Sequence, residues 1–282
     1  MLTRVDRVQA VVADRAPAID AWRNLLGAEV LRDDRLHVLA ARRTVLRVGS
    51  SCVELLEPDG TGAVSGFLAA TGGGLFAVGF ATCEPARSER HFAAQGVAVA
   101  TEGEQLFLAP EALRIPGLRV VISPDTTIPP TGLLRHLYEV TVLVPDFASV
   151  VDRAAAVFGL DTAHFVPISS SEFGYSGTLT LFRPDALDRM EIITPSDATK
   201  TMGRFFAKRG PSLYMCYGES DDLALLRRRL EQYAPRFWSG MADDNVFIHP
   251  GALSGMMLGV SRSSFAWTWS GHPEWVVPRR TS

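Results

Sequence analysis

The segment VDRVQAVVAD (residues 5–14) predicts a strand, and APAIDAWRNLLG (16–27) follows it directly. In the second segment, Ile19, Trp22 and Leu25 recur at helical spacing before a terminal glycine, which predicts a short helix. Three short, partly β-branched runs come next, and we expect each to form a strand. These runs are AEVLRDD (28–34), HVLAARRTVLRVG (37–49) and SCVELLEP (51–58).

The same order of strand, helix and three strands then returns three times. The later copies begin at GLFAVGFATCE (74–84), LYEVTVLVPD (137–146) and SLYMCYGESD (212–221). Copies of roughly 60 to 70 residues indicate a repeated structural unit. The sequence therefore predicts an α+β fold of tandem βαβββ modules.

The linker SPDTTIPPTG (123–132) divides the four modules into two pairs. Consecutive prolines favour an extended connection and end sheet pairing. We therefore expect domains at 1–125 and 126–282. The tail after Arg262 fits no module, and its tryptophans are expected to pack it onto the body of the protein.

Composition excludes several classes of function. The chain has 282 residues, with 28 Lys and Arg against 31 Asp and Glu, which leaves no concentrated basic surface for nucleic acid. Its three cysteines lie in apolar runs without CxxC spacing, which favours reduced, buried thiols. No targeting or membrane-spanning pattern is evident, so a cytoplasmic location is expected, with no membrane partner. Gly72 to Gly74 precede a strand rather than a helix, so no nucleotide cofactor is expected.

VDRVQAVVAD and YEVTVLVPD resemble the opening strand of modules in the vicinal oxygen chelate superfamily, and VELLEP (53–58) and MEIITP (190–195) resemble the fourth strand. This superfamily includes glyoxalase I, bleomycin-resistance proteins, methylmalonyl-CoA epimerase and type I extradiol dioxygenases. The four-module arrangement resembles extradiol dioxygenases or fused glyoxalases. The resemblance implies that each pair of modules closes an incomplete barrel around a cup, with a divalent metal on the cup floor.

The resemblance also implies four metal-ligand positions in each cup. In the N-terminal half these positions fall on Arg7, Glu54, Ala77 and Val121. Arginine has no lone pair with which to ligate a cation. We therefore expect an Arg7–Glu54 pair across neighbouring strands in an inactive cup, either as a structural bridge or as a site for a ligand carboxylate.

In the C-terminal half the four positions fall on Glu139, Glu191, Met215 and Gly259. Two carboxylates ~5 Å apart repel by about 3 kcal/mol at an effective dielectric of ~20, so one would keep its proton. This favours Glu139 and Glu191 as an acid–base pair. In a second interpretation, the two glutamates ligate a divalent metal (Mg²⁺, Mn²⁺, Fe²⁺ or Zn²⁺). In a third, Arg183 or Arg189 neutralises their charge.

Further residues are expected around the C-terminal cup. Tyr214 lies next to a lost ligand position and is the third catalytic candidate. Aromatic walls suit a small organic ligand, aromatic or carbonyl-containing. The predicted ligand-binding residues are Phe173, Tyr175, Phe182, Met215, Tyr217 and His249.

These features favour an isomerase or lyase that moves a proton with its carboxylate pair, with or without a metal. The absence of the iron-binding 2-His-1-carboxylate pattern disfavours ring cleavage. A small-molecule sequestration protein of the bleomycin-resistance kind, or a degenerate scaffold, remains an alternative. A monomer and a homodimer are equally compatible with the sequence.

Overall fold

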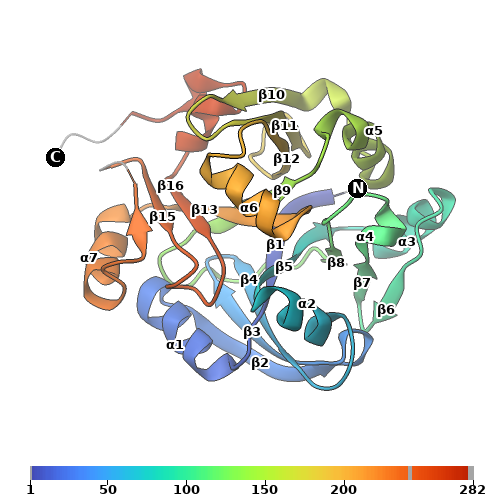
Figure 1. Ribbon diagram of the computed structural model, residues 1–282, viewed down its shortest axis with the longest axis horizontal. Helices are drawn as coiled ribbons and strands as arrows, with labels where there is room; N and C mark the ends of the chain where they lie inside the picture. The colour runs from blue at the N-terminus through green and yellow to red at the C-terminus, as the bar shows by residue number, and fades with distance from the viewer. Residues whose placement is uncertain (1, 241–242, 279–282) are drawn as a thin grey trace.

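The computed structural model describes residues 2–240 and 243–278, which form two curled eight-stranded sheets (Figure 1). The first sheet has the order β2-β3-β4-β1-β5-β8-β7-β6. Its strands are β1 (Leu2–Val11), β2 (Glu29–Leu36), β3 (Ala41–Val48), β4 (Ser51–Pro58), β5 (Gly74–Thr82), β6 (Ala100–Glu102), β7 (Gln105–Leu108) and β8 (Val120–Pro124).

The second sheet repeats this arrangement in the order β10-β11-β12-β9-β13-β16-β15-β14. Its strands are β9 (His136–Leu143), β10 (Phe165–Ser170), β11 (Tyr175–Leu181), β12 (Arg189–Pro195), β13 (Ser212–Ser220), β14 (Trp238–Ser239), β15 (Asn245–Ile248) and β16 (Leu258–Arg262). β1 and β9 occupy equivalent places, because each pairs in parallel with the fourth strand of its own module and antiparallel with the first strand of the next. The predicted α+β fold of tandem βαβββ modules is confirmed.

Seven α-helices and four 3₁₀-helices complete the described residues. The α-helices are α1 (Arg15–Leu26), α2 (Ala63–Thr71), α3 (Pro85–Ala94), α4 (Pro110–Leu113), α5 (Phe147–Phe158), α6 (Thr201–Arg209) and α7 (Leu223–Tyr233). The 3₁₀-helices are η1 (His37–Leu39), η2 (Thr162–His164), η3 (Phe265–Trp269) and η4 (Pro273–Trp275). No helix in these ranges is long and apolar enough to cross a membrane.

The first helix of each half has the same start and stop signals. The Asp14 side chain accepts the backbone N–H of Ala16 at the start of α1, and Asp146 does the same for Ala148 in α5. Both helices end at a glycine with positive φ, a conformation that costs a glycine little. These local signals explain why the repeated strand–helix pattern was visible in the sequence.

One apolar core joins the two halves. Helix α1 packs against α7, and α3 packs against α5, so the modules interlock across the junction. At the centre, the Phe80 ring of β5 lies edge-on to Phe158 of α5 and to Phe182, with centroids 5.7 and 5.1 Å apart. The opposite face of each sheet curls around a cup, and the candidate site residues lie on that face.

The C-terminal tail packs partly as expected. Trp267 is buried against Tyr138 and Leu179 of the second sheet, and Ser270 is fully buried. Trp275 is 41% exposed and stacks on His272. The tail therefore covers one end of the second cup.

The cysteine prediction was correct in part. All three thiols are free, and Cys52 and Cys216 are buried. Cys83 is exposed, contrary to the prediction, because it follows β5 in the turn that leads to α3.

Candidate functional site

The C-terminal cup brings Glu139 and Glu191 onto one surface. The parallel pairing of β9 with β12 sets Glu139 opposite Arg189 and Glu191 opposite Thr141. Residues two apart on a strand point to the same face, so all four side chains belong to one face of the sheet. Arg189 and both glutamates are buried.

Glu139 is held by Arg189. The Arg189 Nε donates to Glu139 Oε2 at 2.6 Å, and its Nη1 donates to the hydroxyl of Ser270 at 2.7 Å. Burial raises the pKa of Glu139, and the guanidinium opposes that rise. Arg189, one of the two predicted neutralising residues, thus pairs with one glutamate. The other, Arg183, is exposed beside Asp185.

Glu191 has no cationic partner at hydrogen-bond distance among the described residues. The Thr141 hydroxyl donates to its Oε2, and the Tyr175 hydroxyl bonds to the same carboxyl group. Burial, followed by the negative charge of Glu139, raises the pKa of Glu191 to about 8. Glu191 is therefore mostly protonated at neutral pH and can change state close to it.

Aromatic side chains surround Glu191. The Tyr217 ring of β13 lies over Gly259 of β16, where a Cβ atom would come within 2.3 Å of the ring. Three of the predicted ligand-binding residues, Tyr175, Met215 and Tyr217, belong to one apolar cluster, and the charge of Glu191 acts on both tyrosines. Burial, followed by the charge of Glu191, raises the pKa of Tyr217 well above its ordinary value. Its hydroxyl is therefore a donor and not a base.

The other predicted site residues lie elsewhere. Phe173 is 42% exposed in the turn between β10 and β11. Phe182 belongs to the core between the halves and does not face the cup. His249 lines a separate cavity. Tyr214 is the exception, because it lines that cavity and also belongs to the apolar cluster of Met215 and Tyr217; burial, followed by the charge of Glu191, raises its pKa.

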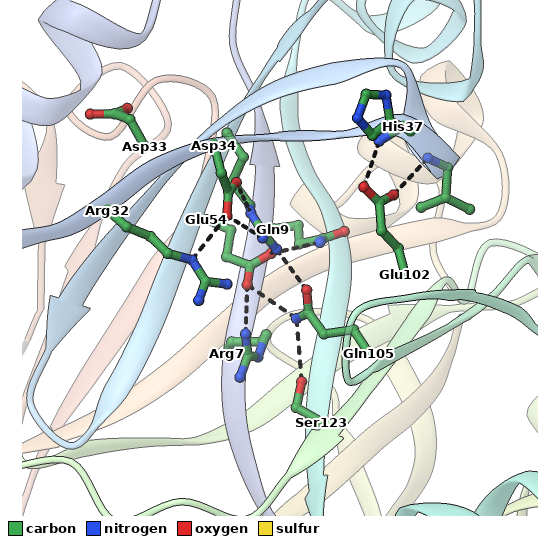
Figure 2. A network of polar contacts seen from close by, with 12 residues as sticks. Arg7, Gln9, Arg32, Asp33, Asp34, His37, Glu54, Glu102, Gln105 and Ser123 are labelled. Carbon is green, nitrogen blue, oxygen red and sulfur yellow. Dashed lines mark hydrogen bonds and ion pairs between the residues drawn. The ribbon is translucent and has the colours of Figure 1, made fainter.

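In the N-terminal cup, Glu54 occupies the strand position equivalent to that of Glu191, and its pKa is shifted in the opposite direction. Figure 2 shows Glu54 of β4 at the centre of a polar network with Arg7 and Gln9 of β1. Arg7 Nη1 donates to Glu54 Oε1 at 2.6 Å, which confirms the predicted Arg7–Glu54 pair. Arg43 donates to Glu54 Oε2 at 3.2 Å and to Gln105 at 2.7 Å. Although burial opposes it, the two arginines lower the pKa of Glu54 to about 2.

Only Arg7 and Glu54 of this network were identified from the sequence, and Gln9, Arg43, Gln105 and Ser123 were missed. Arg43 lies in the otherwise apolar run ARRTVLRVG, and an arginine inside such a run was the available signal. Gln105 of β7 reaches Ser123 of β8, and neither carried a signal of its own. Every Glu54 oxygen is occupied by these donors, so the N-terminal cup presents no free carboxylate at this position.

The predicted metal ligands do not fit a divalent cation. A metal ligand must be deprotonated and accessible to the ion. Glu139 is occupied by Arg189 in the cup, and Glu191 accepts a hydrogen bond from the hydroxyl of Thr141. Among the described residues no three His, Cys, Asp or Glu side chains are grouped to hold a metal. We therefore assign no step to a metal ion.

Comparisons with known proteins identify the fold. No family model and no curated protein sequence matches the chain. A mutant of 4-hydroxymandelate synthase from Streptomyces coelicolor is similar in structure, with a TM-score of 0.70 and 14% identity over 93% of each chain. A xylose isomerase-like TIM barrel/4-hydroxyphenylpyruvate dioxygenase fusion protein has a TM-score of 0.60 and 14% identity, covering 98% of this chain and 52% of the fusion.

A third structure, a variant of Streptomyces coelicolor methylmalonyl-CoA epimerase in complex with 2-nitronate-propionyl-CoA, covers 44% of this chain and all of its own. Its identity is 23% and its TM-score 0.39. The two matches that cover 93% and 98% of this chain show that it has the same fold as these proteins, the tandem-module fold that the resemblance implied.

Proposed function

Starting from the vicinal oxygen chelate fold, we propose that this protein is a small-molecule enzyme that transfers a proton in its C-terminal cup. Glu191 is the acid–base group, and the reaction is of the isomerase or lyase type. The observation that carries this proposal is the contrast between two equivalent glutamates. Glu54 is held ionised with a pKa of about 2, whereas Glu191 has a pKa of about 8.

The raised pKa suits proton transfer at neutral pH. A catalytic acid or base works best when its pKa is near the operating pH. A glutamate used only to bridge strands would be expected to resemble Glu54, with cations on both oxygens. At Glu191, burial and then the negative charge of Glu139 disfavour ionisation, and the positive charge of Arg189 offsets this only in part.

Arg189 has a second role in the proposal. Its Nη2 is buried and has no hydrogen-bond partner in the part of the chain that the structure describes. A buried N–H is suited to stabilising an oxyanion that forms on a substrate. In the proposed step a substrate C–H bond breaks, the proton moves to the Glu191 carboxylate, and the electron pair moves to the adjacent carbonyl oxygen. Reversal of the step returns the proton.

The walls of the cup indicate the class of substrate. Tyr175, Tyr217 and Met215 provide rings and a thioether next to Glu191. Such walls favour a flat or apolar molecule with an enolisable carbonyl group. Sequestration without chemistry is the competing function, and the same aromatic walls support it. A cationic ligand is disfavoured because Arg189 already balances Glu139.

Hydrogen–deuterium exchange tests the proposal. Aromatic and aliphatic α-hydroxy ketones and 2-oxo acids are incubated with the protein in D₂O, and loss of the α-proton signal is followed by NMR. We expect exchange above the buffer rate that rises with pH through about 8, since the carboxylate is the base. Glu191→Gln should lower the rate by at least about 100-fold.

Glu172→Gln is the control, because Glu172 is exposed in the turn before β11. The variant should exchange like the parent. If the Glu191 variant exchanges a substrate as fast as the parent, the assigned role of Glu191 is wrong. Saturable binding without exchange across the panel would instead support sequestration.

A further inference from the structure

A second cavity lies between the two halves, outside the cup. Its volume is about 480 Å³, within the range of small-molecule sites. It is lined by Phe67 of α2, Phe205 and Arg209 of α6, and Tyr214 of β13, with further residues from the loop that follows β15. Figure 1 shows α2 of the first half and α6 of the second half near the middle of the view, and both helices contribute residues to the cavity lining.

Close packing of two glycines forms one side of this cavity. Gly74 begins β5 in the first half, and Gly255 lies in the loop before β16 in the second. A Cβ on Gly74 would come within 2.6 Å of the Gly255 carbonyl oxygen, and both residues have positive φ. The backbones therefore touch at this point, while the helices above them stay apart.

The lining has a distinct charge pattern. Arg209 is the only fully charged residue among the described residues that line the cavity, and none of them is acidic. Arg209 forms no ion pair within the described ranges, and its guanidinium lies 5.6 Å from the centre of the Phe205 ring. The Tyr214 ring is buried, yet its hydroxyl has no hydrogen bond to another described residue. One unpaired cation and a free hydroxyl thus border an apolar, aromatic chamber.

We propose that this cavity binds a small aromatic monocarboxylate at a site separate from the cup. The aromatic body lies between Phe67 and Phe205, and the carboxylate binds the guanidinium of Arg209. Guanidinium–carboxylate hydrogen bonds are charge-assisted, and the apolar lining strengthens them by excluding water.

The residues that line this cavity differ from the acid–base residues of the proposed proton-transfer site. Neither Glu139, Arg189 nor Glu191 lines the cavity. Tyr214 relates the two regions, because it lines the cavity and belongs to the apolar cluster that contains Met215 and Tyr217. Binding at this site therefore does not depend on the acid–base role of Glu191.

Calorimetric titration of the full chain with indole-3-acetate, phenylacetate and their neutral amides tests the site. We expect saturable binding of a carboxylate probe below about 5 mM and at least about tenfold weaker binding of its amide. Arg209→Gln should weaken carboxylate binding by about tenfold or more. Lys208→Gln is the matched control, because Lys208 is exposed on the same helix and does not line the cavity.

Two further variants locate the binding. Thr201 lies exposed at the start of α6 and lines the cavity, so Thr201→Trp should block it without disturbing the core. Glu191→Gln should leave binding unchanged. The proposal is overturned if no carboxylate probe saturates, if the Arg209 and Lys208 variants bind equally, or if only the Glu191 variant loses binding.

Discussion

Arg189 is the side chain on which the charge balance of the C-terminal cup depends. Replacing it with methionine would leave the Glu139 carboxylate buried without its partner. Breaking a buried ion pair in this way costs about 3–5 kcal/mol. We therefore expect Arg189→Met to lower the free energy of unfolding, measured by urea denaturation at pH 7, by that amount.

A second change should compensate for the first. Glu139→Gln combined with Arg189→Met removes both charges, so the double variant should recover much of the loss. Arg183→Met is the control, because Arg183 pairs only at the surface with Asp185. Equal stability of the Arg189 and Arg183 variants would contradict the assigned ion pair.

At the scale of single residues, the sequence predicted part of the candidate site in the C-terminal cup. Glu139 and Glu191 were found because the resemblance to the vicinal oxygen chelate superfamily assigns two metal-ligand positions to them, and Arg189 was one of two candidates to neutralise them. Thr141 and Ser270 were not visible as partners. Ser270 reaches Arg189 across 81 positions of sequence, and only the folded tail brings them together.

At the scale of the strands, β13 and β16 are matched by a large residue opposite a glycine. Tyr217 pairs directly with Gly259, whose missing side chain leaves room for the ring. Gly259→Ala should destabilise the protein by about 1–3 kcal/mol through overpacking. In a double-mutant cycle with Tyr217→Leu, measured by urea denaturation, we expect a coupling of at least about 1 kcal/mol.

Gly66→Ala provides the comparison for this cycle. Gly66 lies in α2, where an added Cβ atom would meet no other atom within 4 Å. Alanine should therefore stabilise the helix by about 0.5–1 kcal/mol. If Gly259→Ala behaves like Gly66→Ala, the ring does not need that space.

The α-helices that the sequence failed to predict are α2, α4 and α6. Three of the predicted helices, α1, α5 and α7, begin at a capping aspartate, whereas AVSGFLAAT (63–71) contains an internal glycine and a polar serine. Helix α2 is stabilised mainly by packing of residues such as Val64 over the first cup. A helix that depends on tertiary packing leaves little local signal in the sequence. The sequence therefore did not predict the cavity beside α2 and α6 either.

For the whole molecule, some pKa values are lowered on folding and others are raised. These opposite pKa shifts predict an unusual dependence of stability on pH. The pKa of Glu54 is lowered to about 2, so its stabilisation is present above about 4.5 and lost as pH falls toward 2. The side chain of His136 is half-buried and desolvation lowers its pKa to about 4, so stability also falls as pH drops below about 6.5. Glu54 and His136 therefore determine how the free energy of unfolding falls at acidic pH.

Two buried carboxyl groups act on the alkaline side. Asp188 accepts the backbone N–H of Val5 across the junction of the halves. Burial raises the pKa of Asp188 to about 7 and that of Glu191 to about 8. The folded state therefore holds protons that the unfolded state has released, and stability falls as pH rises toward 8. We expect maximal stability near about pH 4 to 5 and a loss of about 2 kcal/mol or more between pH 6 and 9.

Urea denaturation at intervals from pH 3 to 9 measures both sides of the curve. Glu191→Gln keeps the shape of the protonated acid but cannot ionise, so the variant should match the parent near about pH 4 and exceed its stability by a growing margin as pH rises to 9. Asp188→Asn should flatten the curve below about pH 7, and the double variant should remove most of the alkaline loss. An alkaline loss that persists unchanged in the double variant would mean that these carboxyl groups ionise normally. Glu191 would then have no raised pKa with which to act as the proposed acid–base group.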